Sequence, residues 1–319
     1  NHFESIFLLG SLYAQNDKLN LAKKLLEKAI KIKPDYADGY YNLGIVYMQL
    51  DERKDAIKCY EKTLQINPEH LDAYNNLGNL LNELGKIKEA LRCYKKVIEI
   101  NPKYVNAYNN IGAIFQKLKN FNESIIYYKK ALKIKPNFEK THNNLGLIHH
   151  HLENYQNAIN FFEKSIKINP EYAEAHSNLG KVFKELGEFK KMVFCFENAI
   201  KYNQDDLVTW YYLSEVKKEI INLNLKKKII KIIDNEKCSK INLAYGNFLL
   251  SKFELLEKNY ENELNYLLKG HKHYYESNKD KFSNTESYWI NIIPEIIKLV
   301  NLIKSNKNNK KNLNKIKPI

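Results

Sequence analysis

Residues 71–104 read LDAYNNLGNLLNELGKIKEALRCYKKVIEINPKY, and the same pattern returns in each window of 34 residues between residues 3 and 206. When the first glycine of a window is counted as position 8, all six windows carry glycine there and the first five carry proline at position 32. A period of this length is typical of stacked helical hairpins. The glycines are Gly10, Gly44, Gly78, Gly112, Gly146 and Gly180, and the prolines are Pro34, Pro68, Pro102, Pro136 and Pro170.

The residue types that recur within a window each fit a place in such a hairpin. Apolar residues at positions 4, 7 and 11 form one stripe along a first helix. A small residue at position 20 lets a second helix approach closely, and a large apolar residue at position 24 fills the space beside the glycine. Proline at position 32 prevents the second helix from continuing. Because one hairpin cannot bury its own stripe, the hydrophobic core has to come from stacking.

This pattern resembles the tetratricopeptide repeat (TPR) over residues 3–206. The resemblance implies an all-α fold, a right-handed superhelical solenoid in which residues 1–206 hold six TPR units. We expect degenerate TPR-like helical units over residues 207–303, with one hairpin near 241–275 and one helix over 287–303. Residues 304–319 are rich in Lys and Asn and predict a linker to a missing domain. The six units are 3–36, 37–70, 71–104, 105–138, 139–172 and 173–206.

A row of asparagines is the strongest candidate for a binding site. Position 6 is asparagine in five successive windows, and asparagine recurs at positions 5 and 9. We expect these positions to line a concave groove, where an amide can donate to and accept from an extended peptide backbone. The alternative is that the amides bond the neighbouring helix or reflect codon bias. The predicted groove residues are Asn42, Asn76, Asn110, Asn144, Asn178, Tyr41, Asn75, Asn109, Asn143 and Asn79.

The row is similar to that in the TPR arm of O-GlcNAc transferases, where asparagines hold peptide backbones. A second known TPR mode, the chaperone carboxylate clamp, uses lysine at position 5, and no window of this chain has lysine there. The row therefore indicates a protein or an extended peptide as partner.

Composition and motifs argue against other classes of function. The chain has no phosphate-binding loop, GxSxG or HExxH motif, so we expect no catalytic residue in it. The net charge is +14, but all basic residues except Arg53 and Arg92 are lysine, and arginine is the better residue for phosphate and guanine contacts. Lys, Asn, Ile and Tyr are abundant, which indicates AT-rich codons as a source of the basic charge. Nucleic-acid binding is therefore not favoured. The consecutive histidines His149–His151 point about 100° apart on a helix and predict no metal site. The four cysteines lack zinc or redox spacing, and no apolar run is long enough to span a membrane.

The last third of the chain adds a second resemblance. It rests on the order of the segments and on the general character of the sequence, without a sharp motif. TPR units, a degenerate hairpin, a short helix and a Lys-rich joint ending at Lys317–Ile319 look like the N-terminal half of bacterial TPR–sulfotransferase fusion proteins. That resemblance implies a recruiting arm, without a cofactor of its own, of a cytoplasmic enzyme that uses 3′-phosphoadenosine-5′-phosphosulfate (PAPS). The alternatives are a free-standing TPR adaptor for complex assembly and the TPR arm of an O-GlcNAc-transferase-like glycosyltransferase. Residue 1 is Asn rather than Met, so we also expect an N-terminal piece to be missing.

Overall fold

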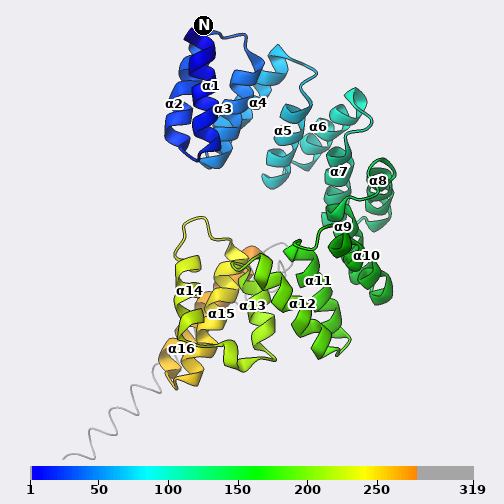
Figure 1. Ribbon diagram of the computed structural model, residues 1–319, viewed down its shortest axis with the longest axis vertical. Helices are drawn as coiled ribbons and strands as arrows, with labels where there is room; N and C mark the ends of the chain where they lie inside the picture. The colour runs from blue at the N-terminus through cyan, green and yellow to red at the C-terminus, as the bar shows by residue number, and fades with distance from the viewer. Residues whose placement is uncertain (1, 279–319) are drawn as a thin grey trace, which may run out of the picture. The chain divides into compact units, whose positions relative to one another are not determined.

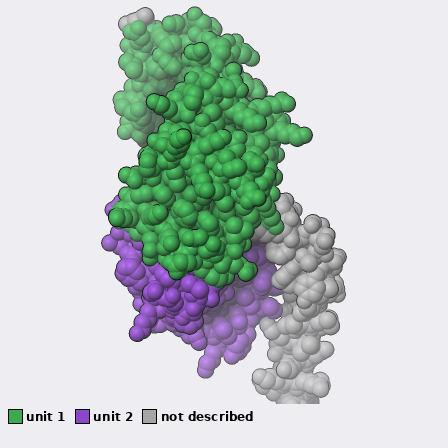
Figure 2. Space-filling model, turned by 90° about the vertical axis from the view of Figure 1, so that its right-hand side faces the viewer, with its two compact units in different colours: residues 1–170 green, residues 171–319 purple. Residues whose placement is uncertain are grey.

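The computed structural model describes residues 2–278, so the helix expected over 287–303 and the linker expected over 304–319 lie outside the described residues. All regular secondary structure between residues 2 and 278 is helical, with sixteen α-helices and one short 3-10 helix. The chain divides into two compact units, unit 1 from Asn1 to Pro170 and unit 2 from Glu171 to Ile319 (Figure 2). The predicted all-α fold of stacked hairpins is confirmed.

Unit 1 consists of five consecutive hairpins, each with a first and a second helix (Figure 1). Each second helix ends two residues before the proline at position 32, as that proline requires. The hairpins are α1 (His2–Gln15) with α2 (Leu19–Ile32), α3 (Ala37–Gln49) with α4 (Arg53–Ile66), α5 (Leu71–Glu83) with α6 (Ile87–Ile100), α7 (Val105–Lys117) with α8 (Phe121–Ile134), and α9 (Glu139–His151) with α10 (Tyr155–Ile168).

The two helices of a hairpin approach so closely that position 8 has no room for a side chain. A Cβ atom on Gly112 would lie 2.6 Å from Cε1 of Tyr128, the position-24 residue of the same hairpin. Where position 20 is Ser124 rather than alanine, its buried hydroxyl donates to the carbonyl of Gly112 across the hairpin, 2.7 Å away. The glycine and the small residue therefore set the helix separation, and the ring fills the gap.

Stacking of one hairpin on the next buries the rest of the stripe. Leu43 and Val46 of α3 are almost fully buried and share one cluster with Ala22 and Leu26 of α2. The same arrangement recurs at α5, where Leu77 and Leu80 occupy the corresponding positions. Each of these first helices thus packs its buried residues against the second helix of the hairpin before it, as a repeat array needs.

Unit 2 begins with one regular hairpin and then departs from the pattern. The helix α13 ends early, at Ser214, and a 3-10 turn follows where the window expects the rest of a first helix. Leu207, Leu225, Ile229, Leu249 and Leu250 form the core beneath it. The helices are α11 (Ala173–Glu185), α12 (Phe189–Tyr202), α13 (Leu207–Ser214), the 3-10 helix (Lys218–Ile220), α14 (Leu223–Ile233), α15 (Lys240–Leu256) and α16 (Tyr260–Ser277).

The helices α15 and α16 form the hairpin in the region where the sequence predicts one. Lys258 turns the chain with a positive φ of 57°, and the side chain of Asn259 caps α16 by accepting from the backbone N–H of Asn262. None of the helices between residues 2 and 278 combines the length and the apolar character that crossing a bilayer requires.

Candidate functional site

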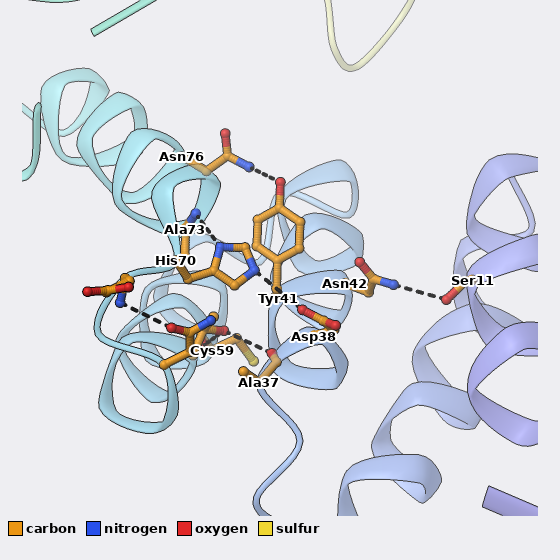
Figure 3. Close-up of polar contacts among 12 residues, drawn as sticks. Ser11, Ala37, Asp38, Tyr41, Asn42, Cys59, His70, Ala73 and Asn76 are labelled. Atoms are coloured by element: carbon orange, nitrogen blue, oxygen red, sulfur yellow. Dashed lines mark hydrogen bonds and ion pairs between the residues drawn. The ribbon is translucent and has the colours of Figure 1, made fainter. Parts of the chain in front are cut away.

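The position-6 asparagines of unit 1 donate hydrogen bonds to the first helix of the preceding hairpin. Asn42 Nδ2 donates to Ser11 Oγ at 3.0 Å, and Asn76 Nδ2 donates to the hydroxyl of Tyr41 at 3.2 Å (Figure 3). The amide of Asn42 therefore joins α3 to α1, and that of Asn76 joins α5 to α3, so these residues support the stack.

The next two rungs use asparagine at both ends. Asn110 Nδ2 donates to Asn75 Oδ1 at 3.1 Å and to Asn79 Oδ1 at 3.0 Å, which links α7 to α5. Asn144 Nδ2 donates to Asn109 Oδ1 at 3.2 Å, which links α9 to α7. The acceptor is always the residue at position 5 or position 9 of the hairpin before. We call these four donors and their acceptors the amide ladder.

Four of the predicted groove residues are buried, and their expected place in an open groove is corrected. Two of them, Asn75 and Asn109 at position 5, turn between two first helices, where they accept from the next hairpin. Asn109, for example, accepts from Thr141 Oγ1 at 2.9 Å in addition to Asn144. The exposed fractions are 9% for Asn75, 9% for Asn109, 0% for Asn143 and 5% for Asn178.

The four position-6 asparagines of unit 1 keep part of their surface exposed and present one free atom. Asn42, Asn76, Asn110 and Asn144 are half-buried. Their amide nitrogens are engaged in the ladder, but among the hydrogen bonds of residues 2–278 none ends on their Oδ1 atoms. A row of four hydrogen-bond acceptors, one per hairpin, is therefore available on the first-helix side of unit 1.

Phenol groups from the second helices donate to amide side chains of the first helices, in one case to a member of the ladder. The hydroxyl of Tyr94 on α6 donates to Asn79 Oδ1 at 2.6 Å, and that of Tyr128 on α8 donates to Gln116 Oε1 at 2.8 Å. Burial raises the pKa of both phenols, so both remain protonated donors at neutral pH. Asn79 Oδ1 accepts from both the Tyr94 hydroxyl and Asn110 Nδ2, so the phenol fixes the oxygen to which Asn110 donates.

Tyr41 is half-buried and held by its neighbours. Its ring centroid lies 4.6 Å from that of His70, whose Nδ1 accepts from the backbone N–H of Ala73 and whose Nε2 lies 3.5 Å from Asp38 (Figure 3). Burial raises the pKa of the Tyr41 phenol, so the group stays neutral. Tyr41 thus presents a fixed hydroxyl and ring edge beside the second rung of the ladder.

Unit 2 keeps Asn178 at position 6 of its first window but carries different residues at other ladder positions, and these are not among the residues predicted from the sequence. Tyr211 and Tyr212 stand at positions 5 and 6 of the window that begins at residue 207. Lys181 donates to Asn178 Oδ1 at 3.2 Å, and burial lowers the pKa of its ammonium against the attraction of Asp206 and Glu174. A change in the sequence could have indicated these residues. Tyrosine and lysine replace asparagine at positions 5, 6 and 9, which are the positions predicted to line the groove.

The histidine run packs against aromatic rings rather than converging on one point. The ring of His149 stacks on Phe161 at 5.3 Å, while that of His151 stacks on Phe121 at 5.9 Å. Burial lowers the pKa of His149, with a smaller contribution from Lys129. Over the described range 2–278 no three His, Cys, Asp or Glu side chains are grouped as metal ligands.

Family models identify the repeat. Models described as tetratricopeptide repeat match residues 37–70, 59–92, 105–138, 139–172 and 173–206, and one described as TPR repeat matches residues 10–51 and 78–119. Together they cover residues 10–206 without a gap, which is more than half of the chain.

Two solved structures of similar proteins share the fold. PilF of Pseudomonas aeruginosa is 20% identical, with 67% of this chain and 97% of that chain covered and a TM-score of 0.56. PilW, described as a widely conserved type IV pilus biogenesis factor, is 20% identical, with 65% and 95% covered and a TM-score of 0.56. Comparison with curated proteins gives no match.

The repeat models and the helical hairpins agree on the same residues, from the first helix to α12. At 20% identity the likeness to PilF and PilW concerns the fold alone. The chain therefore belongs to the tetratricopeptide repeat family.

Proposed function

We propose that the first-helix side of unit 1 binds an extended polypeptide through its backbone. The observation that supports this is the row of four acceptors, Oδ1 of Asn42, Asn76, Asn110 and Asn144, whose nitrogens are engaged with the preceding helix. An acceptor that is already oriented loses little conformational freedom when a peptide N–H donates to it.

The spacing of the row suits an extended chain. Packed helices lie about 8–10 Å apart, and an extended chain advances about 3.3–3.6 Å per residue, so successive rungs meet the peptide about every two to three residues. Amides carry no charge and contact the backbone, so binding of this kind tolerates many side chains. The array is a scaffold that recruits a protein segment and does not itself catalyse a reaction.

Backbone methylation tests the mechanism directly. We would measure binding of the 319-residue chain to a panel of unstructured 12-residue peptides and to the same peptides with N-methylated backbones. Removing the N–H donors is expected to abolish binding, because each hydrogen bond contributes about 0.5–1.5 kcal/mol and up to four are lost together. Equal binding of the methylated peptides would refute the proposal.

A matched pair of variants separates recognition from stability. Replacing Asn42, Asn76, Asn110 and Asn144 together with alanine removes the four free acceptors. Asn109→Ala removes a buried acceptor of the ladder and none of the free ones. We expect the first variant to lose peptide binding and the second to keep it at a temperature where both remain folded.

We also propose, from the order of segments in the sequence, that this array is the non-catalytic recruiting arm of a larger cytoplasmic sulfotransferase that uses PAPS. The basic stretch 304–317 after the helical units supports that choice over a free-standing adaptor or a glycosyltransferase arm. Reading the coding sequence beyond Ile319 tests it. A strand followed by a glycine-containing phosphate loop would agree with the proposal, and a stop codon would contradict it.

A further inference from the structure

A cavity of about 520 Å³ lies in unit 2 between α13, α15 and α16. Its apolar wall includes Tyr211 from α13, Tyr245 and Phe248 from α15, and Leu267 from α16. The ring of Tyr245 lies 5.2 Å from that of Tyr211 and 5.8 Å from that of Phe248, both edge-on, so the three rings brace one another. A cavity of this volume with an aromatic lining is typical of sites for small organic ligands.

One ammonium group enters this aromatic lining. Lys252 Nζ lies 3.9 Å from the centroid of the Tyr211 ring and donates to Ser214 Oγ at 2.9 Å. The Ser214 hydroxyl in turn donates to the carbonyl of Tyr211 at 2.6 Å, so its oxygen is oriented to accept from the lysine. Within residues 2–278 the Lys252 ammonium forms no ion pair with a carboxylate.

The carboxylate that acts on Lys252 is already paired with another cation. Glu215 attracts the Lys252 ammonium, but its Oε2 lies 2.6 Å from Lys184 Nζ. Burial lowers the pKa of Lys252 most, and the positive charges of Lys184 and Lys218 lower it further. Glu263 also lines the cavity, from α16. A half-buried cation with one neutral partner is stabilised when an anion reaches it.

We propose that this cavity binds a small aromatic or aliphatic carboxylic acid. The carboxylate would sit on Lys252 Nζ, and the apolar part would lie against Tyr211, Tyr245 and Phe248. The site is distinct from the amide ladder, because it uses a charge and an apolar aromatic lining where the ladder uses uncharged acceptors in a row. The proposal does not depend on peptide binding by unit 1.

A pair of probes that differ only in charge tests the proposal. We would titrate the 319-residue chain with 2-naphthoate and with 2-naphthamide and measure the heat of binding. We expect the acid to bind at least about tenfold more tightly, the ratio that one charged hydrogen bond provides. Equal affinities, tighter binding of the amide, or no detectable binding of the acid would overturn the proposal.

Three variants assign the effect to the cavity. Lys252→Met is expected to weaken naphthoate binding about tenfold and to leave naphthamide binding unchanged. Lys269→Met, a control on the exposed side of α16, is expected to change neither. Glu263→Gln is expected to leave naphthoate binding equal or tighter, because it removes a repelling charge. Unchanged naphthoate binding in Lys252→Met would refute the assignment.

A final comparison distinguishes a free acid from the end of a polypeptide. A short peptide ending in phenylalanine is tested with a free and with an amidated C-terminus. We expect both to bind more weakly than naphthoate, because a cavity of about 520 Å³ suits a compact ligand better than a peptide. Tighter binding of the free-ended peptide than of naphthoate would replace the small acid by a peptide end and overturn the proposal as stated.

Discussion

Units 1 and 2 use the same hairpin but present different chemistry at the same positions. In unit 1, positions 5 and 6 carry asparagines such as Asn109 and Asn110, which link successive first helices. In unit 2, the window from residue 207 carries Tyr211 and Tyr212 there, and Lys252 lies over the Tyr211 ring. The packing positions remain alike. A repeat array can therefore keep its core and change its ligand by substituting a few side chains beside it.

The largest effects are expected where the two units are alike. Phe162 in unit 1 and Phe196 in unit 2 are both fully buried beside the position-8 glycine of their hairpin. Phe162→Ala and Phe196→Ala should each lower the free energy of unfolding by about 3–5 kcal/mol. Urea unfolding followed by circular dichroism measures this. If one substitution lowers the free energy of unfolding much less than the other, the two units do not share the same packing.

The next effect separates the units at position 5. Asn109 is the acceptor for both Thr141 and Asn144, so Asn109→Ala leaves the buried Thr141 hydroxyl and the half-buried Asn144 amide without that partner and should cost about 1–3 kcal/mol. Ser177, at the same position in unit 2, bonds Thr209, which has Asp206 as a second partner. Ser177→Ala should therefore cost less than Asn109→Ala under the same unfolding conditions, and the reverse order would contradict the role given to the ladder.

Acidification should weaken both units, each through one histidine. Burial lowers the folded-state pKa of His149 in unit 1 and of His271 in unit 2 below the unfolded value of about 6.5. The stability that comes from the neutral ring is fully present above that value and is lost as the pH falls from it through the lower folded-state pKa. In melts between pH 8 and pH 5, His149→Phe and His271→Phe should each reduce the pH dependence, and the double variant should reduce it more. If neither substitution changes the pH dependence of the melting temperature, groups other than these two histidines cause the loss of stability.

The smallest effect concerns thiol reactivity. Burial raises the pKa of Cys59 to about 12 and that of Cys93 to about 11, so these unit 1 thiols carry almost no thiolate at pH 8. Cys238 in unit 2 is only half-buried, and its pKa is raised as well. Titration with a disulfide reagent should modify Cys238 first in the native chain. Earlier modification of Cys59 would indicate that unit 1 opens more readily than its packing implies.

The hairpins could be predicted from the sequence because their determinants are steric and local. Gly112, Ser124 and Pro136 constrain the close approach of the helices, the small side chain between them and the end of the second helix, and these constraints recur every 34 residues. The helix bounds of unit 1 follow directly from these recurring residues. In unit 2 the early end of α13 at Ser214 has no such marker and appears only in the structure.

The candidate site could be predicted only in part. The 34-residue pattern predicts the asparagines, but it does not separate Asn76, which keeps a free oxygen, from Asn75, which is buried. Neighbouring helix positions differ by about 100°, so which of them faces the groove depends on how one hairpin is rotated onto the next. That rotation is a tertiary property. The cavity at Lys252 was missed because it combines three helices whose sequences no longer follow the repeat.

Every rung of the amide ladder points in one direction along the chain. Asn42, Asn76, Asn110 and Asn144 each donate to a hairpin that precedes them in the sequence. During synthesis the ribosome releases the earlier hairpin first, so the acceptor is already in place when its donor emerges. Each new hairpin can then dock as it leaves the exit tunnel, and the growing end offers water-accessible acceptors rather than stranded donors. The direction of the hydrogen bonds therefore matches the order in which the hairpins are translated.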